Sequence, residues 1–290
     1  MSVFNSINNK IKNLILKFFD TFGYRLRGIK KIVQHNNFDS IHKFIIEGLE
    51  NKNHLMIFDV GANVGQSIDR FRSNFNNCSI YSFEPSKKIF EILNKNKKKK
   101  NNFLFNLALT EKAETKVLNS FEYHHINSFY ELEKNSKFEL SRKLSSNEDK
   151  KFQTKEEVKC ISLDEFVKLN NVDQIDILKI DTQGSEPEVL KGAESLLLKQ
   201  RISLIEVELI IGVAYERRLN FYDLEKFLIK YGYRLIAISE GGNIISYSSY
   251  QVDLIYVNEK IYKKIIELDK KNLNISNVMK KVSKLNKSTY

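Results

Sequence analysis

The sequence predicts an α/β protein in which helices cover both faces of a mostly parallel, seven-stranded sheet. Three observations support this prediction. Short apolar runs alternate with helical segments between residues 55 and 257, a pattern typical of parallel sheets. The first apolar run enters a glycine-containing turn at residues 59–65. Hydrophobic residues make up 42% of the 290-residue chain, which is enough for the core of one large domain.

We divide the chain into an N-terminal helical extension (residues 1–50), a main domain (51–260) and a C-terminal helical tail (261–290). Apolar residues recur at helical spacing over residues 1–20, but Lys10, Lys12 and Lys17 interrupt them. This segment is therefore too polar for a signal peptide or a membrane span. Its basic amphipathic character fits either peripheral contact with anionic lipid or packing on protein. A second helical stretch is expected around residues 38–50.

The strands of the main domain are expected, in chain order, at Leu55–Val60, Ser79–Glu84, Phe103–Leu109, Ile175–Asp181, Ile202–Glu208, Arg234–Ile238 and Asp253–Val257. Helices are expected between most of them, for instance over Ser86–Asn94, Glu186–Leu198 and Tyr222–Tyr231. A GGN-containing link before the last strand favours a hairpin at the sheet edge. Residues 121–152 are polar and weakly periodic, and we interpret them as a lid insert, with a disordered excursion as the alternative.

The first strand and its turn read LMIFDVGANVGQS, with Asp59, Gly61, Asn63 and Gly65 at the expected ligand-binding edge. Glycine allows close approach of the backbone to a ligand. An acid here disfavours a phosphate, whereas S-adenosylmethionine carries an ammonium, a sulfonium and no phosphate. Neither the dinucleotide nor the phosphate-loop glycine pattern is present. The alternative is an ordinary tight turn between strand and helix.

The second strand ends at Glu84, roughly 20 residues after the glycine loop, where an acid can accept hydrogen bonds from ribose hydroxyls. The alternative role of Glu84 is to favour the N-terminus of the following helix. Asn106, at the end of the third strand, is expected on the adenine side of the pocket, although asparagine is also a common turn former. These residues extend the predicted cofactor site.

The fourth strand and the turn after it read IDILKIDTQGSEPEVLKGA. Asp181 is expected beside the predicted cofactor site, where it can accept a substrate proton, and Gln183 and Glu186 are expected to contact substrate. For Glu186 the alternative is a favourable interaction with the helix N-terminus.

Further candidate bases are His124 or His125 from the insert, and Glu206 or Glu208 from the fifth strand. Two adjacent histidines in a strand would face opposite ways, so at most one is expected to act, and surface histidines are the alternative. These acids allow a divalent metal, but no compact ligand motif requires one.

The net charge of +11 would suit nucleic acid, anionic lipid or acidic glycans. No basic patch interleaved with aromatics is evident, so nucleic acid is not an expected partner. Cys78 and Cys160 form neither a disulfide framework nor a metal-like spacing, which favours a cytoplasmic protein. If residues 1–20 bind lipid, the protein would be peripheral at the inner face of the membrane. The oligomeric state and the exact acceptor are not readable from the sequence.

Taken together, IFDVGANVGQS, YSFEPS, NLALTEKAET, CISLDEFV, IDILKIDTQGSEPEVLKGA and IEVEL resemble the FkbM family of methyltransferases. FLIKYGYRLIAIS and QVDLIYVNE extend the similarity over about residues 55–258. The resemblance implies a Rossmann-like class I methyltransferase fold, S-adenosylmethionine as donor and O-methylation, commonly of sugar or secondary-metabolite hydroxyls in a glycan, polysaccharide or small molecule. Many relatives have Glu where this chain has Gln183, so an essential base is not expected there. The alternatives are an RNA methyltransferase and a non-catalytic, membrane-associated module.

Overall fold

The computed structural model describes residues 38–50, 52–121, 124–134, 153–210, 215–216, 220–239 and 251–272. Parts of three predicted segments lie outside the described residues. These parts are residues 1–37 of the N-terminal extension, 122–123 and 135–152 of the insert, and 273–290 of the C-terminal tail.

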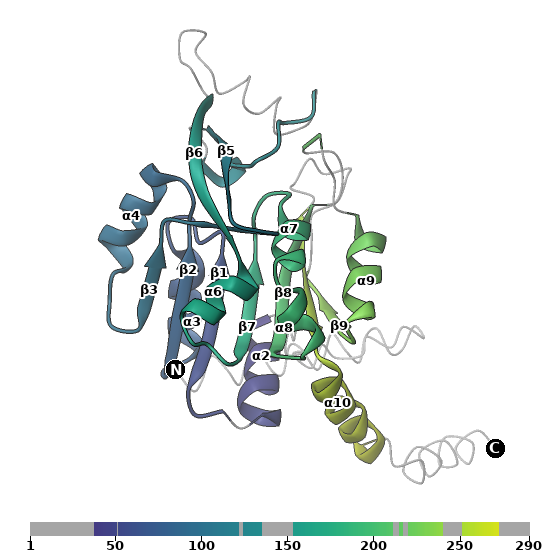
Figure 1. Cartoon of the computed structure of the whole chain (residues 1–290). Coiled ribbons are helices and arrows are strands. Elements are labelled where there is room, and N and C mark those ends of the chain that lie inside the picture. The colour runs from purple at the N-terminus through teal and green to yellow at the C-terminus, as the bar shows by residue number, and fades with distance from the viewer. Residues whose placement is uncertain are drawn as a thin grey trace, which may run out of the picture. The chain divides into compact units, whose positions relative to one another are not determined.

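The main sheet has seven strands in the order β3-β2-β1-β7-β8-β10-β9, as Figure 1 shows. Only β10 is antiparallel to its neighbours, β8 and β9. This confirms the predicted fold class, including the antiparallel pair at one edge. The strands are β1 (Leu55–Val60), β2 (Cys78–Phe83), β3 (Asn102–Phe105), β7 (Ile175–Ile180), β8 (Ile202–Ile210), β9 (Arg234–Ile238) and β10 (Gln251–Val257).

Helices cover both faces of this sheet, and each face has its own apolar core. The first face carries α6 (Leu163–Leu169), α7 (Glu186–Lys191), α8 (Glu194–Leu198) and α9 (Phe221–Lys230). The second face carries α2 (Phe38–Lys43), the π-helical η1 (Phe44–Leu49), α3 (Gln66–Asn74), α4 (Lys87–Lys97) and α10 (Glu259–Asn272).

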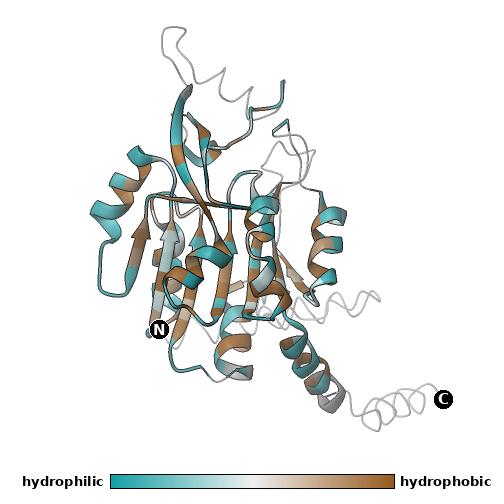
Figure 2. Ribbon diagram, viewed as in Figure 1, coloured by the Kyte–Doolittle hydropathy of each residue, from teal (hydrophilic) through white to brown (hydrophobic). Residues whose placement is uncertain are grey.

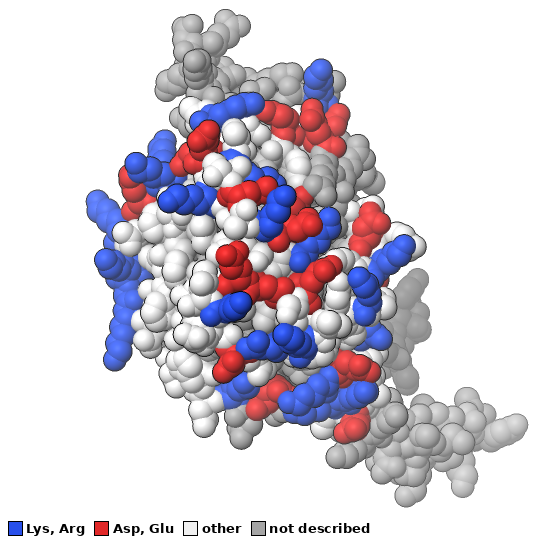
Figure 3. Space-filling view, viewed as in Figure 1, with Lys and Arg blue, Asp and Glu red and all other residues white. Residues whose placement is uncertain are grey.

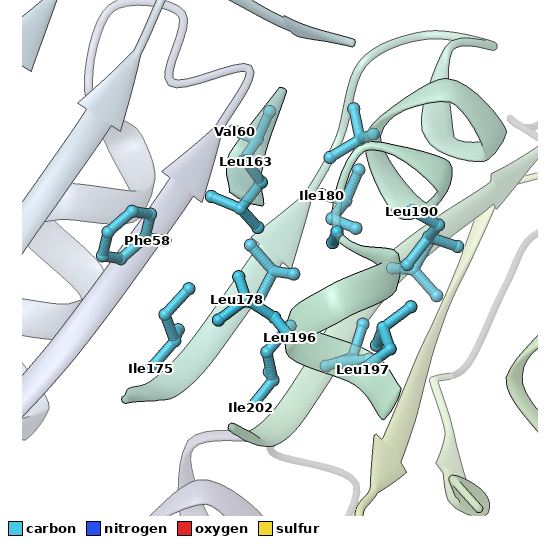
Figure 4. Packing of buried hydrophobic residues seen from close by; sticks show 14 of the residues in the cluster. Phe58, Val60, Leu163, Ile175, Leu178, Ile180, Leu190, Leu196, Leu197 and Ile202 are labelled. Carbon is cyan, nitrogen blue, oxygen red and sulfur yellow. The ribbon is translucent and has the colours of Figure 1, made fainter. Parts of the chain in front are cut away.

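Burial on both faces explains why the central strands β1, β7 and β8 are mostly apolar, as Figure 2 shows. Phe58, Leu178 and Ile180 pack in the first core, which Figure 4 shows in close-up. Their strand neighbours Ile57 and Ile177 point to the opposite face and pack in the second core. The alternation of side chains along a strand therefore divides a single apolar run between two cores.

The predicted helix over Glu186–Leu198 is two helices, α7 and α8, because the chain breaks between them at Gly192. A Cβ atom at Gly192 would lie 2.0 Å from the carbonyl oxygen of Thr110. Only glycine permits this close approach of two backbones. The contact brings the end of α7 against strand β4.

The third strand is shorter than predicted, because β3 ends at Phe105 and the chain then leaves the main sheet. The next residues, β4 (Ala108–Thr110), join a separate sheet in the order β4-β6-β5. Its other strands are β5 (Glu114–Phe121) and β6 (Gln153–Ser162). The sequence did not predict this sheet, which lies at the carboxyl ends of the main strands in Figure 1.

Candidate active site

The turn after β1 forms where the strand order reverses between β1 and β7, the usual binding edge of an open α/β sheet. Gly61 has φ +83°, and a Cβ atom there would lie 1.8 Å from the carbonyl oxygen of Asp181. Asn63 and Gly65 also adopt positive φ, at +50° and +94°. The turn is thus packed directly against the end of β7.

Glu84 follows β2, and its carboxylate is held toward this turn by two backbone donors. The amide of Asn63 donates to Oε2 at 3.0 Å, and the amide of Ser86 donates to Oε1 at 2.9 Å. Burial raises the pKa of Glu84 to about 7 against the effect of these hydrogen bonds. The predicted acid of the cofactor site is therefore ordered and close to the midpoint of its titration at neutral pH.

A cavity of about 380 Å³ lies at the carboxyl ends of β1, β2 and β7. This volume is in the range of small-molecule sites. It is lined by eight of the predicted site residues: Gly61, Asn63, Glu84, His124, His125, Asp181, Gln183 and Glu208. The wall also includes residues that the sequence reasoning did not single out, among them Lys179, Phe129 and Gln251.

Two predicted cofactor residues, Asp59 and Asn106, do not line the cavity but lie behind the residues that do. Asp59 is fully buried, and neither of its carboxylate oxygens has a hydrogen-bond partner among the described residues. Its nearest described cation is Lys179, with Nζ 3.8 Å from Oδ1. Asn106 donates its side-chain amide to the carbonyl oxygens of Glu84 and Pro85, at 3.0 and 2.8 Å, and so supports the backbone beside the cavity.

Gly65 also lies behind the wall, where its backbone caps α3 and a Cβ would meet the side chain of Lys97. Glu186 binds the turn before α7, accepting the backbone amides of Thr182 at 2.9 Å and Gly184 at 3.0 Å. Burial raises the pKa of Glu186 to about 7. This geometry matches the alternative interpretation, in which Glu186 stabilises a helix start.

Glu206, a predicted base, lies below the cavity rather than on its wall. Its Oε2 accepts a hydrogen bond from Arg70 at 2.8 Å and lies 3.1 Å from Nε2 of His42. Burial alone would raise the pKa of Glu206, but these two partners hold it far below its ordinary value. Of the two acids on β8, it is Glu208, two residues further along the strand, that lines the cavity.

Asp181 and Glu208 form a partly buried acid pair on the cavity wall. Lys179 contacts Asp181 Oδ2 at 3.1 Å, and Gln183 donates to Asp181 Oδ1 at 3.0 Å. Burial would raise the pKa of Asp181, but the charge of Lys179 and these hydrogen bonds lower it. Burial and the adjacent Asp181 raise the pKa of Glu208 to about 10. These opposite shifts favour one proton in the pair at neutral pH.

The sequence reasoning missed Lys179, although the alternation along β7 places it on the same side as Asp181. A lysine inside an apolar strand, two residues before a candidate base, was the signal that could have identified it.

His124 and His125 both line the cavity because they lie in a short 3-10 turn rather than in a strand. Burial lowers the pKa of His124. In the described part of the chain, no group of three or more His, Cys, Asp or Glu side chains is arranged to hold a metal ion.

Among the described residues, no helix combines the length and the apolar character needed to cross a bilayer.

Seven strands in this order with one antiparallel strand, and a site at the switch point, define a Rossmann-like class I methyltransferase. Residues 59–235 match the family described as Methyltransferase FkbM domain. The chain therefore belongs to the FkbM methyltransferase family. This confirms the resemblance stated from the motifs, together with S-adenosylmethionine as the expected cofactor.

Several solved methyltransferase structures are similar to this chain at low identity. Magnesium protoporphyrin IX methyltransferase from Synechocystis PCC 6803, with bound SAM, is 10% identical over 85% of this chain and 96% of its own, with a TM-score of 0.40. M. capricolum TrmK, in complex with S-adenosyl-homocysteine, is 17% identical over 72% and 63%, also at 0.40. The METTL16 MTase domain is 9% identical over 77% and 66%, at 0.45. No curated protein sequence matches the chain.

Proposed function

We propose that this protein transfers a methyl group from S-adenosylmethionine to a hydroxyl group, in a sugar of a glycan, polysaccharide or secondary metabolite. The observation that best supports this function is that one cavity joins a glycine turn, the Glu84 carboxylate and the Asp181 carboxylate. The carboxylates lie on different strands and have different partners. Such an arrangement suits separate roles, one in holding the cofactor and one in the reaction.

The chemistry of the wall fits this cofactor. Lys179 is the single lysine or arginine among the described residues that line the cavity, and Asp181 neutralises it. A site of this charge favours a ligand that carries a ribose diol, an ammonium and a sulfonium over a phosphate. Glu84 would accept the ribose hydroxyls, and the turn from Gly61 to Gly65 would lie along the ligand. Asp59 would support the site through Lys179.

Asp181 is the base that the geometry favours. Its lowered pKa favours the ionised form at neutral pH, whereas the raised pKa of Glu208 favours the protonated form, which is a poor proton acceptor. The bound donor supplies an activated methyl group: the acceptor oxygen bonds to the methyl carbon while the C–S electrons return to sulfur. Asp181 takes the hydroxyl proton, and His124 is the second candidate for this role. Orienting the two reactants supplies roughly 7–11 kcal/mol in favourable cases.

Charge on the visible surface bears on the RNA alternative. Figure 3 shows lysine, arginine and acidic side chains interspersed on the face viewed as in Figure 1. Nucleic-acid binding depends on many phosphate contacts from clustered basic groups. This face therefore favours a small or glycan acceptor, and radiolabel transfer from the donor into glycan, lipid and RNA fractions would identify the acceptor class.

The cofactor half of this function is testable without an acceptor. Calorimetry should show that wild-type protein binds S-adenosylhomocysteine and that Glu84→Gln binds it roughly tenfold or more weakly, because hydrogen bonds to a charged acceptor are lost. Asp164→Asn is the matched control, since Asp164 also accepts two backbone amides, those of Ser195 and Leu196, but does not line the cavity. Folded wild-type protein that binds no S-adenosylhomocysteine would refute the proposal.

A further inference from the structure

Gln183 occupies a backbone conformation that a side chain rarely adopts. It follows β7 with φ +53°, in the left-handed region, and its side chain is nearly buried at the cavity wall. Non-glycine residues are strained in this region and persist where surrounding contacts hold them. The next residue is Gly184, which also has positive φ. The turn therefore places this particular side chain between β7 and β8.

The contacts of Gln183 converge on the acid pair. Its side-chain nitrogen lies 3.0 Å from Asp181 Oδ1 and 2.7 Å from Glu208 Oε2, so each N–H has one acceptor. Its side-chain oxygen accepts the hydroxyl of Tyr215 at 3.1 Å, and its backbone oxygen accepts Ser128 Oγ at 2.7 Å. The reverse orientation of the amide would place its oxygen against two carboxyl groups. Tyr215 and the acids thus select one orientation.

The acid pair is surrounded by other charged and titratable groups. Local contacts therefore decide which of the two carboxyl groups carries the single proton. Two neighbouring carboxylates do not both ionise readily in a buried site. A neutral amide can donate to an ionised and a protonated carboxyl at once, whereas a third acid cannot without adding charge. The groups that face the pair are Lys179 on β7, Asp59 on β1, Asp253 on β10, Glu186 on α7, and Tyr215.

We propose that Gln183 is a positioning residue, which donates both side-chain N–H groups to Asp181 and Glu208 and holds the pair with Asp181 ionised at the cavity wall. This role rests on the function proposed above, in which Asp181 takes the proton of the acceptor. Gln183 itself takes no proton.

Carbon-13 NMR of labelled Asp and Glu carboxyl groups tests this role directly, with the two resonances assigned from Asp181→Asn and Glu208→Gln. Gln183→Met keeps the length of the side chain but has no N–H donor. We expect the titration of Asp181 to move upward by about one pH unit or more, since a hydrogen bond to its charged form is lost. Gln183→Glu should move it further, because it adds a third acid.

Two further variants keep the result interpretable. Tyr215→Phe removes the donor that orients the amide, and should produce a smaller shift in the same direction even if Gln183→Met does not fold. Gln174→Met is the matched control, because Gln174 precedes β7 and donates only to Ser203 among the described hydrogen bonds of its side chain. A Gln183→Met titration within about 0.3 unit of wild type, or an equal shift in Gln174→Met, would overturn the role.

The same samples separate this role from the cofactor hypothesis. Shifted titrations in a protein that binds no S-adenosylhomocysteine would leave the amide contact standing and refute the methyl-transfer function. Unchanged titrations in a protein that binds it would refute the positioning role alone.

Discussion

Replacing Lys179 with methionine removes the ammonium group that lies between the buried carboxylate of Asp59 and the partly exposed carboxylate of Asp181. Nζ of Lys179 lies 3.1 Å from Asp181 and 3.8 Å from Asp59. The side chain of Lys179 is 9% exposed and that of Asp59 is fully buried. Methionine has a similar length and leaves no large cavity, so the variant isolates the loss of charge.

The expected loss in the free energy of unfolding follows from the carboxylates that remain in the interior without Lys179. Removing one partner of a buried ion pair typically destabilises a protein by about 3–5 kcal/mol, because the remaining charge is uncompensated. Among the described cations, Asp59 would retain only the weaker influence of Arg70, which is not in direct ion-pair contact with it. For a domain of this size, a loss of that order corresponds to a decrease in Tm of roughly 6–20 °C.

Urea denaturation at pH 7 measures the loss, with Lys191→Met as the matched control. Lys191 pairs with Glu111 at 3.6 Å, but both side chains are exposed, so the control should change the free energy of unfolding by less than about 1 kcal/mol.

Loss of Lys179 raises the folded-state pKa values of Asp59 and Asp181. A raised folded-state pKa favours the folded protein as pH falls, so the difference from wild type should shrink toward pH 5.

The stability of a double variant tests whether the uncompensated charge causes the loss. Adding Asp59→Asn to Lys179→Met should recover part of the lost stability, because one of the two uncompensated charges is removed. The reasoning would be wrong if Lys179→Met unfolded within about 1 kcal/mol of wild type, or if Asp59→Asn destabilised that variant further.

Two other predictions concern the cofactor side of the cavity. Gly61→Ala should destabilise the fold and abolish S-adenosylhomocysteine binding in calorimetry, because its Cβ would lie 1.8 Å from a backbone oxygen. Gly232→Ala, with φ +80° but a flexible side chain as its nearest neighbour at 3.3 Å, should cost only about 1–2 kcal/mol. Equal costs for the two variants would contradict the steric reasoning. The affinity for S-adenosylhomocysteine should rise about tenfold from pH 6 to pH 8, because the pKa of Glu84 is raised to about 7 and only its ionised form is the strong acceptor. Glu84→Gln should flatten this dependence, and an affinity that falls with pH would refute it.

Much of the fold could be read from local patterns. The apolar runs predicted the main strands to within a few residues, because strands buried on both faces are apolar throughout. The small sheet could not be predicted in this way. It pairs β4 and β5 with β6, which lies more than 30 residues beyond the end of β5, and the partly exposed strands β5 and β6 have no continuous apolar run.

The candidate site, like the fold, could be predicted from the sequence only in part. By itself, the sequence determined the glycine turn, Glu84, Asp181 and the methyltransferase family, because these depend on residue type and order along the chain. Only the tertiary structure decided which acids reach the cavity. Glu206 and Glu208 are two residues apart on one strand, roughly 7 Å along its axis. The packing of α2 and α3 places His42 and Arg70 against Glu206, while Glu208 extends past these helices into the cavity.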